Sequence, residues 1–358
     1  MRVVELFAGA GGAALGLEAA GFEHLACIEW GEDACATLRA AGLPAVEGDV
    51  RDPDLYESEW AGCDLLWSSF PCQCWSSAGD RLGPKDERNG WPWTVDAIDC
   101  LEPRWFAAEN VTGLLQHKGA CEDGCLGPDL CPRAYFERVI LAQLRERFES
   151  VQYRVLNASS FGVPQHRRRV IIVAGPGPVQ WPEPTHGKPS GQGDLFGRSL
   201  LPWVTIGQAI RLDGSIRQGV INTESYGLDV PTTDPAPTIL VRSPIRFDPG
   251  ARLIGEGAQG GTRPELLDRP SPAVLAIERS GPGANPQKMQ RASDALCLST
   301  ARRRLTVEEC ATLQDFPADH PFQGTKTSRY VQLGNAVPPK LAEVVGRAIM
   351  RAQKENER

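Results

Sequence analysis

The strongest constraint on the fold is the alternation of short apolar runs with helical stretches in the first half of the chain. We predict strands near residues 3–7, 25–29, 45–47, 64–69, 105–108, 153–156 and 170–174. Helical patterning separates them over residues 13–20, 33–41 and 134–148. Such alternation predicts an α/β fold in which a mostly parallel sheet carries helices on both faces.

The character of the sequence changes beyond residue 178. The following stretch is rich in Pro, Gly and Arg and shows little helical periodicity. Helical patterning then returns, with Thr306 as a predicted N-cap and a closing helix over 341–352. We therefore expect three parts: a first domain over 1–178, a smaller loop-rich, β-containing domain over 179–300, and a C-terminal segment over 301–358 that packs back on the first domain.

The charge balance weighs against a generally basic nucleic-acid binder. The 358 residues include 38 Lys and Arg against 45 Asp and Glu, a net charge of -7. Basic residues nevertheless cluster at 167–169 and 302–304. Local patches of this kind can follow a phosphate backbone even on an acidic protein. Nucleic acid therefore remains an open class of partner.

Cysteine usage and hydropathy favour a cytoplasmic protein. Eleven cysteines at irregular spacing are expected to be reduced thiols rather than a disulfide framework. Glu5 and Glu18 interrupt the N-terminal apolar stretch that a secretory signal needs. No apolar run approaches the ~20 residues of a membrane span. We expect no membrane association.

A glycine-rich turn follows the first predicted strand, where ligands of open α/β sheets bind. It comprises Phe7, Ala8, Gly9, Gly11 and Gly12. Glycines let the backbone turn tightly and enter a helix whose N-terminus favours negative charge. Alone, the turn fits a dinucleotide enzyme, a methyltransferase or mere tight packing.

Acidic residues end the next two predicted strands. Glu29 stands where a carboxylate commonly takes ribose hydroxyls, and Asp49 offers an acceptor for an adenine amino group. Either residue alone would be interpreted as a solvated acid at a strand end. Together with the glycine turn, the three successive strand ends predict a nucleoside-binding cleft.

Two further strand ends carry reactive groups. Cys72 follows the strand at 64–69 and stands beside Pro71, which restricts the backbone. A cysteine is ordinarily a small buried hydrophobe, and Cys74 is a nearby alternative, but the Pro-Cys pair favours Cys72 as a nucleophile. Glu109 ends an apolar strand, where a carboxylate is costly unless it is paired or used.

Five motifs then stand in the order seen in the cytosine-5 DNA methyltransferase family. They are Phe7–Gly11, Pro71–Gln73, Glu109–Val111, Gln165–Arg169 and Gln332–Pro338. The sequence resembles that family at both ends, and its middle corresponds to the variable target-recognition domain. The resemblance implies a Rossmann-like methyltransferase sheet. It also implies methyl transfer from S-adenosyl-L-methionine to carbon 5 of a flipped cytosine in a specific duplex DNA sequence.

The same resemblance implies the catalytic roles. Carbon 5 of cytosine is a poor nucleophile until a group adds at carbon 6, and a thiolate can make that addition. Cys72 would be this nucleophile and form a covalent intermediate at carbon 6. Glu109 would hold or protonate N3. Arg167 and Arg169 would position the base.

The resemblance also implies the binding residues. Those for the cofactor are Phe7, Ala8, Gly9, Gly11, Gly12, Glu29, Trp30, Asp49, Val50, Pro71, Asn335 and Val337. Those for DNA are Gln73, Ser76 and Gln165. The polar segment 76–88 is expected to close over the flipped base. We expect a monomer that binds double-stranded DNA, and the presence of a companion restriction endonuclease stays open.

The sequence departs from the family pattern in two places. Phe70 replaces a second proline, and Cys74 replaces a smaller residue. A group of possible zinc ligands follows Glu109, comprising His117, Cys121, Cys125 and Cys131, with Cys100 upstream. Its spacing is not a standard zinc pattern, so we expect reduced thiols and no metal.

Three other functions fit the sequence less well. A transfer-RNA methyltransferase of the same family is disfavoured, because the long arginine-bearing middle suits groove contacts with duplex DNA. A DNA-binding protein without catalysis is disfavoured by intact Cys72 and Glu109. An oxidoreductase would explain the glycine turn, but not the cysteine loop or the late Gly-Asn-Ala-Val-Pro motif.

Overall fold

The computed structural model describes residues 1–56, 58–71, 89–117, 131–188, 200–210 and 305–358, and four two-residue strands between 219 and 304. Several predicted features lie outside the described residues. They are Cys72, Gln73, Cys74, Ser76, the segment 76–88, Cys121, Cys125 and most of 179–300.

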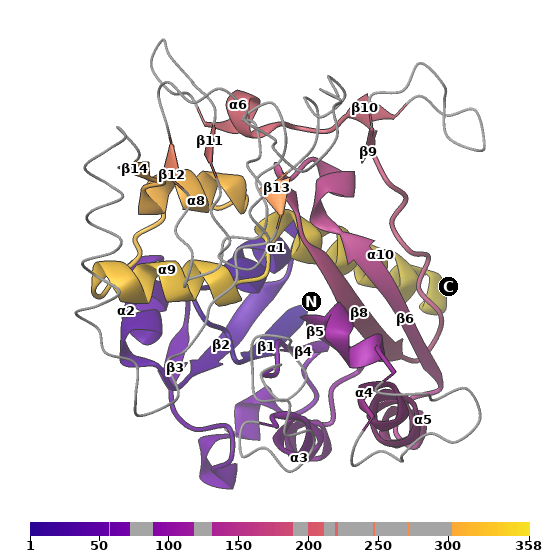
Figure 1. Ribbon diagram of the computed structural model, residues 1–358. Helices are drawn as coiled ribbons and strands as arrows, with labels where there is room; N and C mark the ends of the chain where they lie inside the picture. The colour runs from indigo at the N-terminus through magenta and orange to yellow at the C-terminus, as the bar shows by residue number, and fades with distance from the viewer. Residues whose placement is uncertain are drawn as a thin grey trace.

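A seven-stranded sheet with the order β3-β2-β1-β4-β5-β8-β6 forms the framework (Figure 1). Its strands are β1 (Arg2–Leu6), β2 (Glu23–Glu29), β3 (Ala45–Glu47), β4 (Leu65–Ser68), β5 (Trp105–Val111), β6 (Ser150–Asn157) and β8 (Arg168–Gly175). The first five strands are parallel, and β8 is antiparallel to both of its neighbours. The predicted mostly parallel α/β sheet is confirmed.

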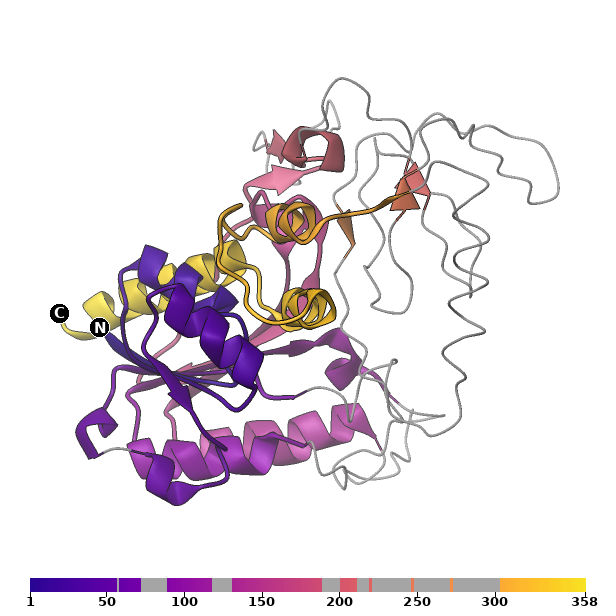
Figure 2. The same cartoon turned by 90° about the vertical axis from the view of Figure 1, so that its left-hand side faces the viewer.

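Helices cover both faces of this sheet (Figure 2). On one face, Val3 of β1 belongs to an apolar cluster with Leu17 of α1 (Gly12–Ala20) and Ile349 of α10 (Pro339–Asn356). On the other, Val4 shares a cluster with Ile98 of α3 (Trp91–Leu101) and Leu144 of α5 (Leu141–Arg145). Helix α2 (Glu32–Ala40) packs on the α1 side. Strands buried on both faces explain the continuous apolar runs in the sequence.

The C-terminal segment forms a third apolar cluster beside the glycine turn. It joins α6 (Ile206–Ala209), α8 (Val307–Leu313) and the chain around α9 (Lys326–Asn335) with Ala10. Thr306 is the N-cap of α8, as predicted, because its Oγ1 accepts from Glu309 N at 3.1 Å while Glu309 Oε2 accepts from Thr306 N at 2.7 Å.

Two helices differ from the prediction. The stretch 134–148 is not one α-helix, because α4 (Pro132–Tyr135) and α5 flank a π-helical turn (Phe136–Ile140). Helix α3 was not predicted, since Gly90-Trp91-Pro92 resembles a loop. Pro92 stands in the first turn of α3, where a missing N–H costs nothing because that donor has no intrahelical acceptor.

The remaining elements are short. They are 3-10 turns Pro53–Leu55, Ser58–Trp60, Thr112–Leu115 and Ala158–Phe161, and strands β7 (Gln165–His166), β9 (His186–Gly187), β10 (Leu201–Pro202), β11 (Gly219–Val220), β12 (Arg246–Phe247), β13 (Ser271–Pro272) and β14 (Arg303–Arg304). Among the described residues, none of the helices has the length and apolar character needed to cross a membrane.

Candidate functional site

The glycine-rich turn leaves the carboxyl end of β1 with a left-handed backbone at three positions. Phe7, Gly9 and Gly11 have φ values of 55°, 54° and 81°. Glycine adopts such values freely, whereas Phe7 does so at a conformational cost. A strained aromatic residue at the start of the turn indicates that the surrounding structure imposes this shape.

Glu29 holds this turn against the end of β2. Its Oε2 accepts from Gly9 N at 2.8 Å, and its Oε1 accepts from Trp30 N at 3.1 Å and from Gly31 N at 2.9 Å. An ionised carboxylate offers about four lone-pair sites, so acceptor capacity remains for a ligand hydroxyl. The adjacent Trp30 side chain is 72% exposed, which is unusual for so large an apolar group.

Asp49 lies just beyond β3, beside the same strand ends. Its carboxylate accepts from Arg51 Nε at 2.9 and 2.8 Å and from Arg51 N at 3.0 Å. The hydrogen bonds from Arg51 lower the pKa of Asp49, because they favour its ionised form. Val50 is buried, and its carbonyl accepts from Tyr56 Oη at 2.8 Å. The predicted nucleoside-binding acids therefore occur at neighbouring strand ends.

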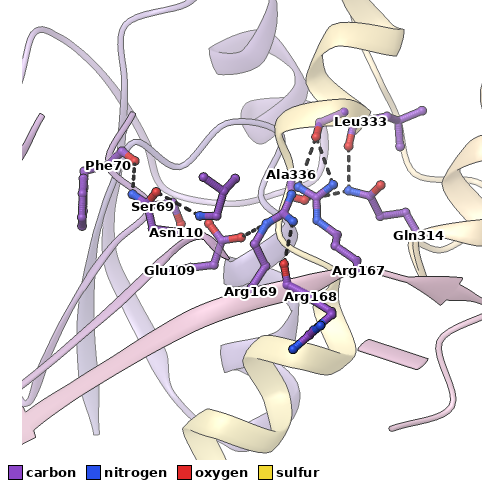
Figure 3. Close-up of polar contacts among 12 residues, drawn as sticks. Ser69, Phe70, Glu109, Asn110, Arg167, Arg168, Arg169, Gln314, Leu333 and Ala336 are labelled. Atoms are coloured by element: carbon purple, nitrogen blue, oxygen red, sulfur yellow. Dashed lines mark hydrogen bonds and ion pairs between the residues drawn. The ribbon is translucent and has the colours of Figure 1, made fainter. Parts of the chain in front are cut away.

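A second group of residues gathers at the ends of β4 and β5 (Figure 3). Asn110 Nδ2 donates to the Phe70 carbonyl at 3.1 Å, while Asn110 Oδ1 accepts from Val111 N at 2.9 Å. Asn110 thus fixes the peptide that directly precedes Pro71. Cys72, the next residue, lies outside the described range.

Glu109 forms a buried ion pair in the same group. Its Oε1 lies 2.6 Å from Arg169 Nε, and the two side chains are 9% and 7% exposed. Removing both charges from water is costly, so a buried ion pair is weak evidence for a stabilising role. Figure 3 shows the Arg169 side chain meeting Glu109 of the neighbouring strand.

Arg167 and Arg169, which the family resemblance assigned to the base, have different partners among the described residues, and their role at the base stays a prediction. The Arg167 side chain is fully buried, and both Nη atoms donate to the Gly334 carbonyl at 3.1 Å. Gly334 belongs to the late Gly-Asn-Ala-Val-Pro motif. Arg167 therefore connects the sheet to that motif.

The late motif lies directly against the glycine turn. A Cβ atom on Gly12 would overlap the Val337 carbonyl, so the close approach requires glycine. Val337 is buried and Asn335 is exposed. Buried Gln314 holds the motif, because its Nε2 donates to Leu333 O at 2.6 Å and to Ala336 O at 2.7 Å. The sequence interpretation did not single out Gln314.

Gly90 and His320 were also missed. A Cβ on Gly90 would lie 2.5 Å from Pro71 Cδ and 3.0 Å from Phe7 Cζ, so Gly90 packs where the glycine turn and the Pro71 peptide meet. His320 Nε2 donates to the Ala10 carbonyl at 3.0 Å. No local sequence pattern predicts either contact, because the partners are far apart in the sequence.

The predicted DNA contacts are only partly described. Gln165 is fully buried on β7, and neither atom of its side-chain amide has a hydrogen-bond partner among the described residues. β7 pairs with β13 in parallel. Cys131 Sγ lies 3.9 Å from His117 Nδ1, but the two cysteines between them are not described, so the absence of a metal there stays a prediction.

Comparisons with known proteins were made for the whole sequence. The family model described as "C-5 cytosine-specific DNA methylase" matches residues 1–193 and 262–351. Type II methyltransferase M.NaeI of Lentzea aerocolonigenes is 33% identical over 361 residues, which covers 98% of this chain and 75% of that protein. Type II methyltransferase M.NgoMIV of Neisseria gonorrhoeae is 33% identical over 371 residues, covering 99% and 98%.

Solved structures share the fold. A putative DNA modification methyltransferase encoded within a prophage (E. coli) superimposes with a TM-score of 0.58 at 18% identity, covering 99% of each chain. The Dnmt2 methyltransferase of S. pombe gives 0.57 at 16%, with the same coverage. The matched motifs and the full-length relatives lead to one assignment. The chain belongs to the C-5 cytosine-specific DNA methylase family.

Proposed function

We propose that this chain transfers a methyl group from S-adenosylmethionine to carbon 5 of a flipped cytosine in a specific duplex DNA sequence, through a covalent bond between Cys72 and carbon 6. The observation that carries the proposal is the buried Glu109–Arg169 pair, 2.6 Å apart. It lies beside the Phe70 peptide that Asn110 anchors. The Glu109 carboxyl, which would act as a general acid or hydrogen-bond donor, therefore lies near the Phe70 peptide, two residues before the proposed nucleophile.

The strand ends of β1, β2 and β3 fit a nucleoside cofactor. Glu29 has lone pairs left for ribose hydroxyls, and the exposed Trp30 ring offers an apolar face beside them. Asp49 is the acceptor for an amino group, provided that Arg51 leaves one of its lone pairs free. S-adenosylmethionine, when bound, supplies an electrophilic methyl group. Phe7, Val50, Pro71, Asn335 and Val337 are the further proposed contacts.

The catalytic groups then have distinct tasks. In its protonated form, Glu109 hydrogen-bonds or protonates N3 of cytosine, which draws electrons from the ring and makes carbon 6 open to addition. Arg169 holds the Glu109 carboxyl in one orientation. Cys72 would add to carbon 6 as the thiolate, which makes carbon 5 nucleophilic enough to take the methyl group from the sulfonium and leave a thioether. Loss of the carbon 5 proton to a base would then expel Cys72 from carbon 6 as the thiolate. Arg167 holds the late motif in place through its hydrogen bonds to the Gly334 carbonyl.

DNA is the proposed partner. The base must leave the stack before a thiolate can reach carbon 6, at a cost of about a few kcal/mol. In this proposal, residues 1–178 carry catalysis, residues 179–300 read the target, and Gln73, Ser76 and Gln165 contact the DNA around the flipped base. The relatives M.NaeI and M.NgoMIV are named Type II methyltransferases, which supports a place beside a restriction endonuclease. A monomer suffices to read such a site.

The test expresses the chain in cells that lack cytosine methylation and examines their DNA by bisulfite sequencing. Cys72→Ala is the matched control, and its melting temperature and cofactor binding show that it folds. We expect protected cytosines in one short sequence context, and none with the variant. If the folded wild-type chain protects no DNA cytosine but protects transfer RNA, the DNA assignment is wrong.

A further inference from the structure

Three metal-ligating side chains meet on the face of the sheet that α1 covers. Glu5 lies on β1, and His24 and Cys27 lie on the neighbouring β2. One ligand atom from each of the three lies within 4.8 Å of the other two. None of these residues belongs to the proposed cofactor or base-binding groups. The cluster therefore needs an explanation of its own.

A β-bulge creates this cluster. Residues three apart in a regular strand point to opposite faces of a sheet, so His24 and Cys27 would normally be separated. The register pairs Val3 with His24 and Val4 with Ala26, which leaves Leu25 as an extra residue. Beyond the bulge, Cys27 pairs with Glu5. Bulges commonly re-aim a side chain, and this one brings His24 to the face of Cys27 and Glu5.

The three side chains are buried, and three of their polar atoms have no hydrogen-bond partner among the described residues. Those of Glu5 and His24 are each 1% exposed, and Cys27 is fully buried. Glu5 Oε2 and both ring nitrogens of His24 have no hydrogen-bond partner among the described residues. Buried polar groups are nearly always paired with protein, water or an ion. The distance from His24 Nε2 to Glu5 Oε2 is 3.5 Å, which is too long for a good hydrogen bond.

That same distance suits two ligands of one metal ion. Tetrahedral zinc with bonds of about 2.0–2.3 Å holds neighbouring ligand atoms roughly 3.4–3.6 Å apart. A carboxylate oxygen, an imidazole nitrogen and a thiolate sulfur are all zinc ligands. A bound dication would also neutralise the carboxylate and thiolate, which are costly to bury as anions.

We propose that Glu5, His24 and Cys27 form a structural zinc site that joins β1 to β2, with a water molecule as the fourth ligand. Glu5 stands two residues before Phe7, and Cys27 stands two residues before Glu29. The ion would therefore brace both strands beneath the turn that Glu29 and Gly9 close. This inference does not depend on the proposed reaction, because it concerns metal content alone.

Metal content and cobalt spectroscopy test the proposal. The chain is purified without a histidine tag from zinc-supplemented medium, and its zinc is measured by plasma mass spectrometry after dialysis. Cys27→Ser and Glu5→Gln are compared with Cys63→Ser, which changes another fully buried cysteine outside the cluster. We expect the first two variants to hold one equivalent less zinc than the wild type, and Cys63→Ser to hold the same amount.

Cobalt replacement adds a readout that identifies the thiolate. The wild type and Cys63→Ser should show a sulfur-to-cobalt charge-transfer band that Cys27→Ser loses in part or in full. Because the comparison is between variants, zinc bound elsewhere in the chain does not affect it. A wild type without stoichiometric zinc overturns the proposal, and so does a folded Cys27→Ser protein with unchanged zinc. If the variants do not fold, the wild-type protein decides. Absence of stoichiometric zinc, or a melting temperature that a chelator leaves unchanged, overturns the proposal.

Discussion

The Arg169 guanidinium lies 2.6 Å from the Glu109 carboxylate although the two residues are not opposite each other in the sheet. β5 and β8 are antiparallel, and the register pairs Arg169 with Val111 and Glu109 with Ile171. The ion pair therefore runs diagonally between two adjacent strands, within reach of a long side chain. The antiparallel insertion of β8 next to β5 produces this contact.

Replacing Arg169 by Ala should destabilise the protein strongly. The change leaves the Glu109 charge buried without its partner, which typically costs about 3–5 kcal/mol. Urea unfolding measures this loss. Arg169→Ala/Glu109→Gln should recover a large part of it, since the uncompensated charge is gone. Equal stability of the single and double variants would contradict the explanation. Both variants should lose methylation.

Gly90→Ala should impair cofactor binding and turnover. The added methyl group would lie 2.5 Å from Pro71 Cδ and 3.0 Å from Phe7 Cζ, and such overpacking costs typically about 1–3 kcal/mol. Isothermal titration calorimetry with S-adenosylhomocysteine, the demethylated cofactor, measures the change in affinity. Gly177→Ala is the matched control, because its methyl group would meet only the movable end of Asn356. Unchanged affinity in Gly90→Ala would count against the packing role.

Gln314→Leu should loosen the late motif. It removes the donor to the Ala336 carbonyl and one of two donors to the Leu333 carbonyl, which also accepts from Ala336 N at 3.3 Å. An unsatisfied buried group costs about 1–3 kcal/mol. We expect a lower melting temperature and weaker cofactor binding, because Val337 packs against Gly12. Gln314→Glu keeps the size but removes the amide N–H, so it tests the donor at a pH where the introduced carboxyl is ionised. Normal behaviour of both variants would refute this role.

His320 should make the free energy of unfolding depend on pH below about 6.5. Burial lowers the pKa of His320 from 6.5, so the unfolded chain binds a proton at higher pH than the folded chain does. The contribution is complete above pH 6.5 and is lost as the pH falls through the folded pKa. His320→Phe keeps an aromatic ring beside Phe316 and Phe322. Urea titration measures the free energy of unfolding of both proteins at several pH values. As the pH falls, the wild type should lose stability relative to His320→Phe. A constant difference would exclude the effect.

The sequence predicted much of the sheet because its strands are buried on both faces. Apolar runs in the sequence predicted β1 to β5. The glycine turn, Glu29 and Asp49 stand at the ends of three of these runs, so they were predicted to lie at one edge of the sheet. Helix α3 was missed because Pro92 in its first turn also suits a loop. The π-helical turn at Phe136–Ile140 has no distinct sequence pattern.

Local periodicity thus determined the fold class, and residue chemistry singled out Cys72 and Glu109, whose predicted catalytic roles came from the family resemblance. Only the tertiary structure decided which arginine meets Glu109, where Arg167 goes, and that His320 reaches Ala10 from 310 residues away. It also decided that a bulge at Leu25 turns His24 towards Glu5. Strand pairing, register and long-range packing depend on the whole folded chain, so no local pattern specifies them.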